Sequence, residues 1–516
     1  MKKRFISVVA VMCGIVLFAG CNGKNASRNG SGDNVLTIWM RNSAPIGGYT
    51  DKSQFPFKEA LEQETGIKLD FIFPALGQDP QQFNLLLASR NLPDIVSYYW
   101  GDIPGGAEKA IKDGYILKMD DAFLKKNSPD FYEIINSNEA YRKLSQTDSG
   151  DYYYYPRLLD IGGEKEITAV VSGFVMRADW LRELGLEAPE TYDEWYRVLK
   201  AFQEQKGAAA PFSGRVAEIK KGFESGFGFL LSYYLDGDKV KYGYYTPQYQ
   251  DYLRTMHKWY NEGLLDQNFA NIDERMLTAK MLSNEVGATY AWIGSGMGVW
   301  LKAAQEENFD LVGVQFPVME KGSPVEYGSR NLPVASLGSA ISADSEKKEL
   351  AAHFLNFGYT EKGHMLNNFG IEGQTYHMEN DYPRYTELVT NNVEGLSMQQ
   401  VLSSYAGLDY LNSYRQDYRY IQQYYNMPQQ QAAQKIWMQT STDHIMPTVS
   451  LTEAESSECA QIMTEITTYQ NEMYLKFIMG AEPISKFDDY MNALKEMGIE
   501  RAIEIKQNAY DRFLNK

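Results

Sequence analysis

The strongest constraint on the fold is an alternation of strand and helix patterns near the start of the chain. Strand-like runs of β-branched and aromatic residues alternate with helical runs, in the order 35–39, 57–64, 68–73, 79–90 and 92–99. In the second helical run, Asp79 can cap the helix and Pro80 can occupy its first position. This β-α-β-α-β order predicts a parallel sheet with right-handed crossovers, in which ligands bind at the carboxyl ends of the strands.

The predicted strands end at residues 40–43, 74–77 and 99–102. Because the carboxyl ends of parallel strands meet at one edge of the sheet, the topology places Arg41, Trp100 and Asp102 together. We therefore predict that these three side chains contact a ligand.

The remaining sequence predicts a second α/β unit and a helical end. A chain of 516 residues with 44% hydrophobic content is too large for one core, which indicates at least two lobes. Thr191 and Glu194 have the spacing of a capping box that opens an amphipathic helix. Beyond Leu396 the pattern is mainly helical, with tyrosines at i, i+4 spacing at positions Tyr410, Tyr414 and Tyr418.

Residues 285–300, E-V-G-A-T-Y-A-W-I-G-S-G-M-G-V-W, combine a strand pattern with glycines that allow close backbone approach. The G-S-G-M-G run lacks the spacing of a dinucleotide fingerprint and the lysine of a P-loop, so it does not predict a nucleotide site. Trp292 precedes these glycines. Its ring either packs in a core or forms a stacking platform in a cleft, and this pattern leaves both interpretations open.

Charge and metal-ligating residues exclude several classes of partner. The formal net charge of −17 disfavours nucleic acid and anionic lipid surfaces, so we expect a neutral ligand or one whose charge is met locally. The five histidines show no paired metal-site spacing, and we predict no metal and no cofactor. After removal of the N-terminal region and acylation of Cys21, Cys459 is the one remaining free cysteine, so no intrachain disulfide is expected.

The N-terminus has the features of an export signal. Basic residues at 2–4 precede an apolar run at 5–19 that is too short to span a bilayer comfortably. The following L-F-A-G-C resembles the bacterial lipoprotein box, which implies a signal peptide at 1–20, lipidation of Cys21 and attachment to the extracytoplasmic face of the cell membrane. Residues 21–33 then form a flexible tether. An ordinary cleaved signal and an uncleaved anchor are the alternatives, and both export the chain.

The aromatic content is high, with 37 Tyr and 8 Trp. Amphipathic rings suit sugars because the apolar faces of a sugar stack on the ring while its hydroxyls meet polar groups. For any single tyrosine, packing on a helix surface is the stronger interpretation.

Several ordered motifs together resemble one family, the extracellular solute-binding proteins of ABC importers in the carbohydrate-type family 1. They are F-K-E-A-L-E-Q-E-T-G-I-K at 57–68, L-P-D-I-V at 92–96, R-A-D-W-L-R-E-L-G-L-E-A-P-E-T-Y-D-E-W at 177–195, W-Y-N-E-G-L-L-D at 259–266, A-D-S-E-K-K-E-L-A-A-H-F-L-N-F at 343–357 and G-I-E-G-Q-T-Y at 370–376.

The resemblance implies an α/β fold of the periplasmic-binding-protein type, with two lobes, a ligand cleft between them and a helical C-terminal extension. The expected N-lobe comprises 34–160 and 330–385, and the expected C-lobe 161–329 and 386–516. In this comparison Trp292 corresponds to a sugar-stacking aromatic, Trp100 and Asp102 to a contact loop, and Tyr155 to an aromatic before proline. Loop position alone adds Arg330, Glu372 and Tyr376.

The function implied is capture of an oligosaccharide outside the membrane and delivery to the ABC permease subunits, by a monomer that is not an enzyme. A binding protein for a peptide or another non-sugar solute is one alternative. A lipoprotein glycoside hydrolase is the other, and it would need two carboxylates roughly 5–9.5 Å apart across a sugar bond.

Overall fold

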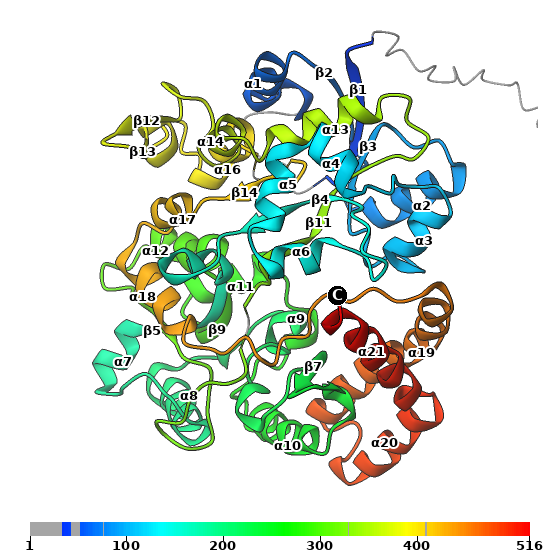
Figure 1. Cartoon of the computed structure of the whole chain (residues 1–516). Coiled ribbons are helices and arrows are strands. Elements are labelled where there is room, and N and C mark those ends of the chain that lie inside the picture. The colour runs from blue at the N-terminus through cyan, green and yellow to red at the C-terminus, as the bar shows by residue number, and fades with distance from the viewer. Residues whose placement is uncertain (1–32, 43–51, 76, 329, 408–409) are drawn as a thin grey trace, which may run out of the picture.

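The computed structural model describes residues 33–42, 52–75, 77–328, 330–407 and 410–516. The predicted signal peptide, Cys21 and all of the tether except its last residue lie outside this part. Within it, no helix is both long enough and apolar enough to cross a bilayer. Two lobes, each built around its own sheet, are seen one above the other in Figure 1.

The first lobe contains the predicted β-α-β-α-β segment. Strand β1 pairs in parallel with both β2 and β3, which confirms the parallel arrangement. The elements are β1 (Val35–Met40), α1 (Pro56–Thr65), β2 (Lys68–Ile72), α2 (Asp79–Ser89) and β3 (Ile95–Tyr98).

Helix α2 begins differently from the prediction. Asp79 is its first helical residue rather than its cap, and Gln78 holds the cap position without a side-chain hydrogen bond. The Asp79 carboxylate instead accepts a hydrogen bond from the backbone N–H of Asn42, at 3.0 Å. The carboxylate oxygen that the local pattern predicted to cap α2 therefore makes a tertiary hydrogen bond at the end of β1.

The first sheet has six strands in the order β14-β4-β11-β3-β1-β2. Strands β4 (Tyr155–Leu159) and β11 (Val334–Ile341) complete its centre, and β11 is antiparallel to both β3 and β4. The other elements of the first lobe are α3 (Gly106–Lys112), α4 (Asp121–Asn127), α5 (Pro129–Asn136), α6 (Glu139–Ser145), α13 (Lys348–Phe357), α14 (Glu361–Phe369), β12 (Tyr376–Glu379), β13 (Tyr382–Tyr385), α15 (Glu387–Thr390) and α16 (Met398–Tyr405).

The second lobe has a four-stranded sheet in the order β10-β5-β9-β6. The capping box of α8 is present as predicted: Thr191 accepts from the N–H of Glu194, and Glu194 accepts from the N–H of Thr191. The elements are β5 (Ser172–Arg177), α7 (Ala178–Leu184), α8 (Tyr192–Lys206), β6 (Ala210–Phe212), α9 (Val216–Ile219), β7 (Tyr233–Asp236), β8 (Lys239–Tyr242), α10 (Gln248–Asn261), α11 (Glu274–Leu282), β9 (Val286–Trp292), α12 (Val299–Ala303), β10 (Leu311–Val314) and α18 (Pro428–Trp437).

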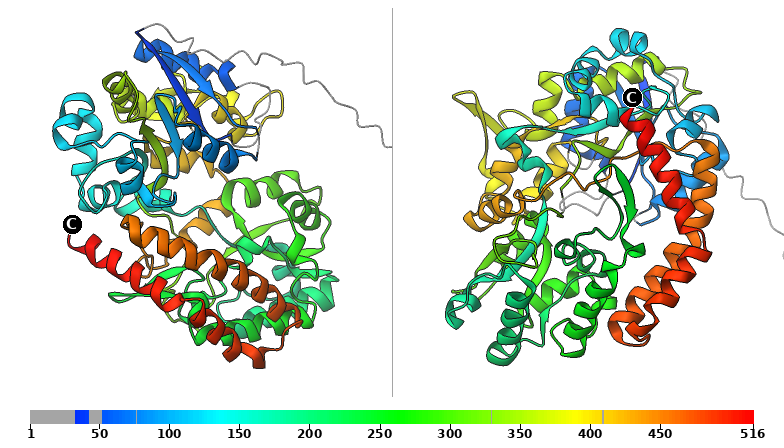
Figure 2. Two further views of the ribbon diagram at one scale, coloured as in Figure 1. Left: turned by 90° about the vertical axis from the view of Figure 1, so that its right-hand side faces the viewer. Right: turned by 60° about the horizontal axis from the view of Figure 1, so that its bottom comes forward.

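The chain ends in three helices: α19 (Glu453–Met479), α20 (Phe487–Glu496) and α21 (Ile499–Leu514). We call them the C-terminal helices. Figure 2 shows them as a curved band along one side of the second lobe, with the chain end beside the first lobe. Tyrosines join this band to α10: the hydroxyls of Tyr252 and Tyr474 lie 3.1 Å apart, and Tyr249 packs on Tyr490. Part of the tyrosine surplus is therefore core packing.

The predicted lobe boundary at residue 385 differs from the structure. Strand β14 (Arg415–Gln416) pairs with β4, so the chain still belongs to the first sheet at this point. Residues Tyr410 and Tyr414 are not helical, contrary to the prediction from their spacing, and the next helix is α17 (Tyr418–Tyr424). The Tyr410 ring instead packs against Phe57 of α1, at 4.7 Å between ring centroids.

The chain passes between the lobes at 160–171, 330–333 and 417–427, and we call these the crossing segments. They are held together: the N–H of Asn331 donates to the carbonyl of Ala169 at 2.9 Å, and Arg330 pairs with Glu166 at 2.8 Å. A further stretch at 438–452, which we call the strap, runs from α18 along the space between the lobes to α19 (Figure 1).

Candidate functional site

The strand ends that were predicted to bind ligand point toward the second lobe. Strand β4 leads directly into a crossing segment, so its carboxyl end is its end nearest that lobe. Because β11 is antiparallel to both β4 and β3, and β3 and β2 are parallel to β1, the carboxyl ends of β1, β2 and β3 point the same way. In the second lobe, β5 starts after the crossing and pairs with the end of β9, so Ser172 and Trp292 face back toward the first lobe.

Arg41 lies at this edge in a fixed position. Its guanidinium donates to the Tyr99 hydroxyl at 2.7 Å and lies 4.9 Å from the centroid of the Tyr99 ring. It also pairs with the carboxylate of Asp79 at 3.6 Å. About a third of the Arg41 side chain remains exposed, 36%, so a positioned donor faces the space between the lobes.

Asp102 lines a cavity of about 640 Å³ whose walls come from both lobes, which we call the interlobe cavity. This volume falls within the roughly 300–1,000 Å³ of typical ligand sites. The first lobe contributes residues 101–106, the second lobe Ser232 and Tyr233, and the strap residues 445–451. The surrounding protein raises the pKa of Asp102 by desolvation, although the carboxylate is reached by solvent, and Lys506 acts in the opposite direction.

Trp292 differs from every other tryptophan in the chain. Its side chain is 42% exposed, whereas the others among the eight are at most 4% exposed. It ends β9 beside the crossing segment, where the N–H of Ile293 donates to the carbonyl of Val171. This exposure contradicts the interpretation of Trp292 as a core residue, and its role as a stacking platform in a cleft stays a prediction.

Three other predicted site residues lie inside the protein. Trp100 is fully buried and donates its indole N–H to the carbonyl of Val96 at 3.0 Å. Tyr155 is also fully buried, with its hydroxyl 2.7 Å from that of Ser128. Arg330 is occupied by its ion pair in the crossing segments. Trp100 and Tyr155 therefore offer no surface to a ligand in this structure, and Arg330 leaves only 11% of its side chain exposed.

Glu372 and Tyr376 lie elsewhere, in a groove of about 1,000 Å³ lined entirely by segments of the first lobe and by Arg415 and Arg419 next to it. Burial, with a smaller contribution from the Glu372 charge, raises the pKa of Tyr376 to about 12. Glu372 and Tyr376 therefore lie apart from the interlobe cavity. Among the predicted site residues, Asp102 lines that cavity, whereas Arg41 and Trp292 are not among its lining residues.

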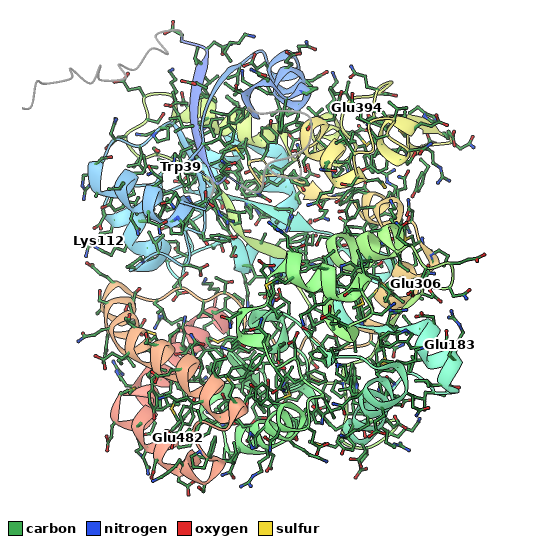
Figure 3. The ribbon with its side chains drawn as sticks, turned by 180° about the vertical axis from the view of Figure 1, so that it is seen from behind. Trp39, Lys112, Glu183, Glu306, Glu394 and Glu482 are labelled. Atoms are coloured by element: carbon green, nitrogen blue, oxygen red, sulfur yellow. The ribbon has the colours of Figure 1, made fainter. Side chains whose placement is uncertain are left out.

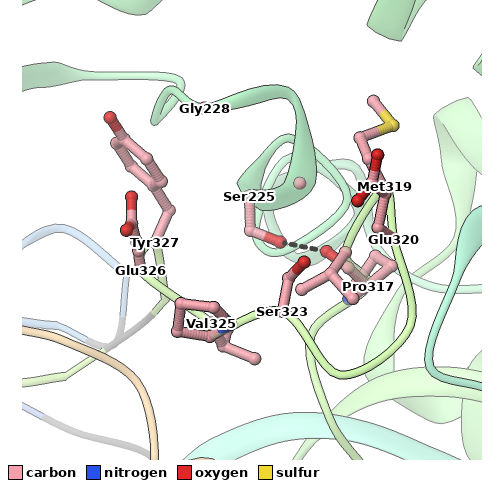
Figure 4. A pocket seen from close by; sticks show the side chains of 12 residues that line it. Ser225, Gly228, Pro317, Met319, Glu320, Ser323, Val325, Glu326 and Tyr327 are labelled. Carbon is pink, nitrogen blue, oxygen red and sulfur yellow. Dashed lines mark hydrogen bonds between the residues drawn. The ribbon is translucent and has the colours of Figure 1, made fainter.

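A smaller cavity of about 370 Å³ lies in the second lobe between residues 225–228 and 317–327 (Figure 4). The Ser225 hydroxyl donates to the carbonyl of Pro317 across its base, at 3.2 Å. Tyr327 at its margin stacks on His444 of the strap, with ring centroids 3.9 Å apart. Its lining comes from one lobe alone.

The part of the chain that the structure describes contains no group of three or more His, Cys, Asp or Glu side chains that could hold a metal ion. The prediction of no metal and no cofactor stays a prediction.

Comparison with known proteins identifies the family. A family model for bacterial extracellular solute-binding proteins matches residues 47–365, which is more than half of the chain. The chain belongs to this family.

Relatives of this solute-binding protein cover most of its length. Lipoprotein LipO of Bacillus subtilis (strain 168) is 24% identical over 430 residues, 79% of each chain. The fructooligosaccharide ABC transporter substrate-binding protein FusA of Streptococcus pneumoniae serotype 4 is 22% identical over 98% of each chain. Among solved structures, the alginate-binding protein AlgQ2 without calcium ion superposes with a TM-score of 0.76 at 23% identity, covering 92% of this chain and 98% of that one. This last similarity supports the two-lobe fold.

Sequence reasoning missed part of the cleft of this solute-binding protein. Tyr233, the strap and Lys506 of α21 all line the interlobe cavity. Lys506 belongs to an ordinary amphipathic helix, and its neighbours in the cavity are far away in the chain. No local pattern could have indicated its position.

Proposed function

We propose that this protein is the lipid-anchored substrate-binding component of an ABC importer, which captures an oligosaccharide between its lobes and delivers it to the permease. The observation that carries this proposal is the exposed ring of Trp292 at the lobe edge. The protein buries all its other tryptophans, and exposure of an apolar indole ring to water costs free energy. A sugar face stacked on Trp292 would remove that ring surface from water.

The polar groups at the opposing edge complete the proposed site. Arg41 can donate to sugar hydroxyls and Asp102 can accept from them, both through charge-assisted hydrogen bonds. A ligand that touches both lobes binds the closed arrangement better than a separated one, and it stabilises closure only by that difference in affinity. No bond of the ligand is made or broken in this mechanism.

The relatives support the carbohydrate class and the anchor. FusA is named for fructooligosaccharides, AlgQ2 for alginate, and LipO as a lipoprotein. We place Cys21 as the lipidated residue, the body at the extracytoplasmic face of the cell membrane, and the permease as the partner that receives the sugar from a monomeric binding protein.

A thermal-shift screen of the protein without its signal peptide and with Cys21→Ala tests this function. The panel contains neutral oligosaccharides of fructose, glucose, galactose and xylose, oligogalacturonates, and peptides. A ligand at one hundred times its Kd should add about 2.7 kcal/mol of stability. Calorimetric titration of the best sugar should then show a roughly thirtyfold higher Kd for Trp292→Ala, as expected for a central aromatic contact.

Val393→Ala is the matched control, because Val393 is 99% exposed and lies on a loop of the first lobe. It should bind the sugar like the wild type. Stabilisation by peptides alone, or hydrolysis of the sugar during the titration, would contradict the proposed function.

A further inference from the structure

The interlobe cavity contains two opposite charges that have no ionic partner. Among the described residues, neither Asp102 nor Lys506 has an oppositely charged group within 4 Å. The Lys506 ammonium lies 5.6 Å from the centroid of the Tyr233 ring, its one recorded close contact. Asp102 is exposed in the cavity and Lys506 is partly buried, so both charged groups remain free to bind polar groups of a ligand between the lobes.

The two charges come from different lobes. Asp102 lies on the loop that follows β3 of the first lobe, and Lys506 lies on α21, which packs on the second lobe. The remaining wall is largely apolar, with Ile103, Leu230 and Met463 among its residues, and Ser232 and Thr448 add hydroxyls. This lining suits a ligand with apolar C–H faces and many hydroxyl groups.

We propose that Asp102 and Lys506 together bind the hydroxyls of one uncharged sugar unit of the ligand, with the carboxylate accepting and the ammonium donating. This inference rests on the proposed function and adds the charge class of the sugar. A hydroxyl can satisfy either charge because it both donates and accepts. A uronate carboxylate would pair with Lys506 but would be repelled by Asp102, so the pair selects against acidic sugars.

The position of the pair also assigns a role to the C-terminal helices. Residues of α19, Ser456, Cys459 and Met463, line the same cavity as Lys506 of α21. The helical extension therefore completes the sugar site, and the sugar unit that it contacts bridges the two lobes.

Calorimetric titration of the wild type, Asp102→Asn and Lys506→Gln with a neutral oligosaccharide and with oligogalacturonate tests the pair. Each substitution should raise the Kd for the neutral sugar about tenfold to hundredfold, the effect of losing a hydrogen bond to a charged group. Asp102→Asn should improve the weak binding of oligogalacturonate, since it removes the repulsion. Lys495→Ala, which removes a lysine near the start of α21, and Asn508→Ala, on α21 itself, are the controls and should leave both affinities unchanged.

Cys459 supplies an independent readout, because it lines the same cavity and is the one thiol of the test protein, which lacks the signal peptide and carries Cys21→Ala. The neutral sugar should slow its reaction with a thiol reagent in the wild type, and should do so less in both variants at the same sugar concentration.

If both variants bind the neutral sugar as tightly as the wild type, Asp102 and Lys506 do not bind it and the inference fails. It fails as well if the sugar binds the wild type without changing the reactivity of Cys459. Either result would leave the proposed function intact. Preferential binding of oligogalacturonate by the wild type would contradict the inference that the bound sugar is uncharged. Absence of binding to every oligosaccharide would overturn the proposed function and the pair together.

Discussion

The lobes meet along two sides of the molecule, through contacts of different kinds. On one side the crossing segments are held by backbone hydrogen bonds, such as that from the N–H of Leu159, at the end of β4, to the carbonyl of Pro333 at 2.8 Å. Helix α18 packs next to them, where Gln434 donates to the carbonyl of Ile167 at 2.9 Å. On the other side the C-terminal helices meet the first lobe through side chains. Glu453 of α19 pairs with Lys109 at 3.3 Å and with Lys112, which lies beside α19 in Figure 3.

The C-terminal side also includes Arg512, which pairs with Asp148 of the first lobe at 2.8 Å, and Ser456, which accepts from the N–H of Gly105 at 2.6 Å. Exposed ion pairs contribute little stability and are screened by salt. The Glu453 pairs are partly exposed contacts of this kind, whereas Asp148 and Ser456 are largely buried. The difference teaches that the crossing segments can stay joined while the Glu453 contacts of the C-terminal side separate at small cost. A binding protein that opens and closes needs this asymmetry.

The largest expected effect comes from removing a buried side chain of α18, which packs next to the crossing segments. Trp437 of α18 is fully buried, donates to the carbonyl of Val314 at 2.9 Å, and lies where any side chain on Gly173 would clash with its ring. Trp437→Ala should lower the free energy of unfolding by about 3–5 kcal/mol, as for other buried aromatic residues. Urea unfolding followed by circular dichroism measures this. The exposed Trp292→Ala should cost no more than about 0.5 kcal/mol, and an equal loss in both variants would refute the distinction.

A pH effect tests how the C-terminal helices are attached to the second lobe. Complete burial raises the pKa of Glu224 from about 4.5 to about 8, and its carboxyl lies near the hydroxyls of Tyr252 and Tyr474 that join α10 to α19. Because the folded-state pKa is raised, the stabilisation from this group is complete below pH 4.5 and is lost as the pH rises to 8.

The free energy of unfolding of the wild type should therefore fall by several kcal/mol relative to that of Glu224→Gln between pH 4.5 and 8. Thermal or urea unfolding of both proteins at several pH values measures the difference. Parallel pH profiles for the two proteins would show that the buried carboxyl is not protonated in the folded state.

Breaking the ion pairs should change lobe separation more than stability. Glu453→Lys places a third positive charge beside Lys109 and Lys112. We expect a larger radius of gyration without ligand, a severalfold rise in Kd for the sugar, and little change in Tm. Glu465→Lys is the control, since Glu465 is an exposed residue of the same helix with no ion pair among the described residues. A similar radius for both variants would contradict a role for the Glu453 contacts.

The smallest effect is that of salt on the unaltered protein. The Debye length falls from about 8 Å at physiological ionic strength to about 3 Å at 1 M. Small-angle scattering of the ligand-free wild type should show a slight increase in radius over this range. Glu453→Lys should show no increase, because salt screens the repulsion among its three lysines. Equal salt responses of the wild type and Glu453→Lys would show that the change in radius does not come from the Glu453 ion pairs.

The sequence predicted the parts of the site that depend on local patterns. The parallel order of β1, β2 and β3 follows from short alternating runs, and this order was enough to place Arg41 and Asp102 at the edge facing the second lobe. Trp100 follows the same strand as Asp102, yet Phe83 of α2 covers its ring, with centroids 5.4 Å apart. Burial of an aromatic residue at a strand end depends on what packs over it, which a strand pattern does not contain.

Long-range contacts decided the remaining differences. Tyr410 and Tyr414 have helical spacing, but Tyr410 packs on α1 and the following β14 joins the first sheet, so tertiary packing overrode the local preference. Lys506 reaches the cavity because α21 folds back across the second lobe toward the first. Part of the high tyrosine content, which suggested sugar binding, packs the C-terminal helices against α10.

The most direct test of the central claim is small-angle scattering of the wild type and Trp292→Ala with and without the neutral oligosaccharide found in the screen. Binding between the lobes predicts a smaller radius of gyration for the wild type with sugar, and no change for Trp292→Ala at the same sugar concentration. Sugar binding that leaves the wild-type scattering unchanged, or that contracts both proteins equally, would contradict a site between the lobes that depends on Trp292.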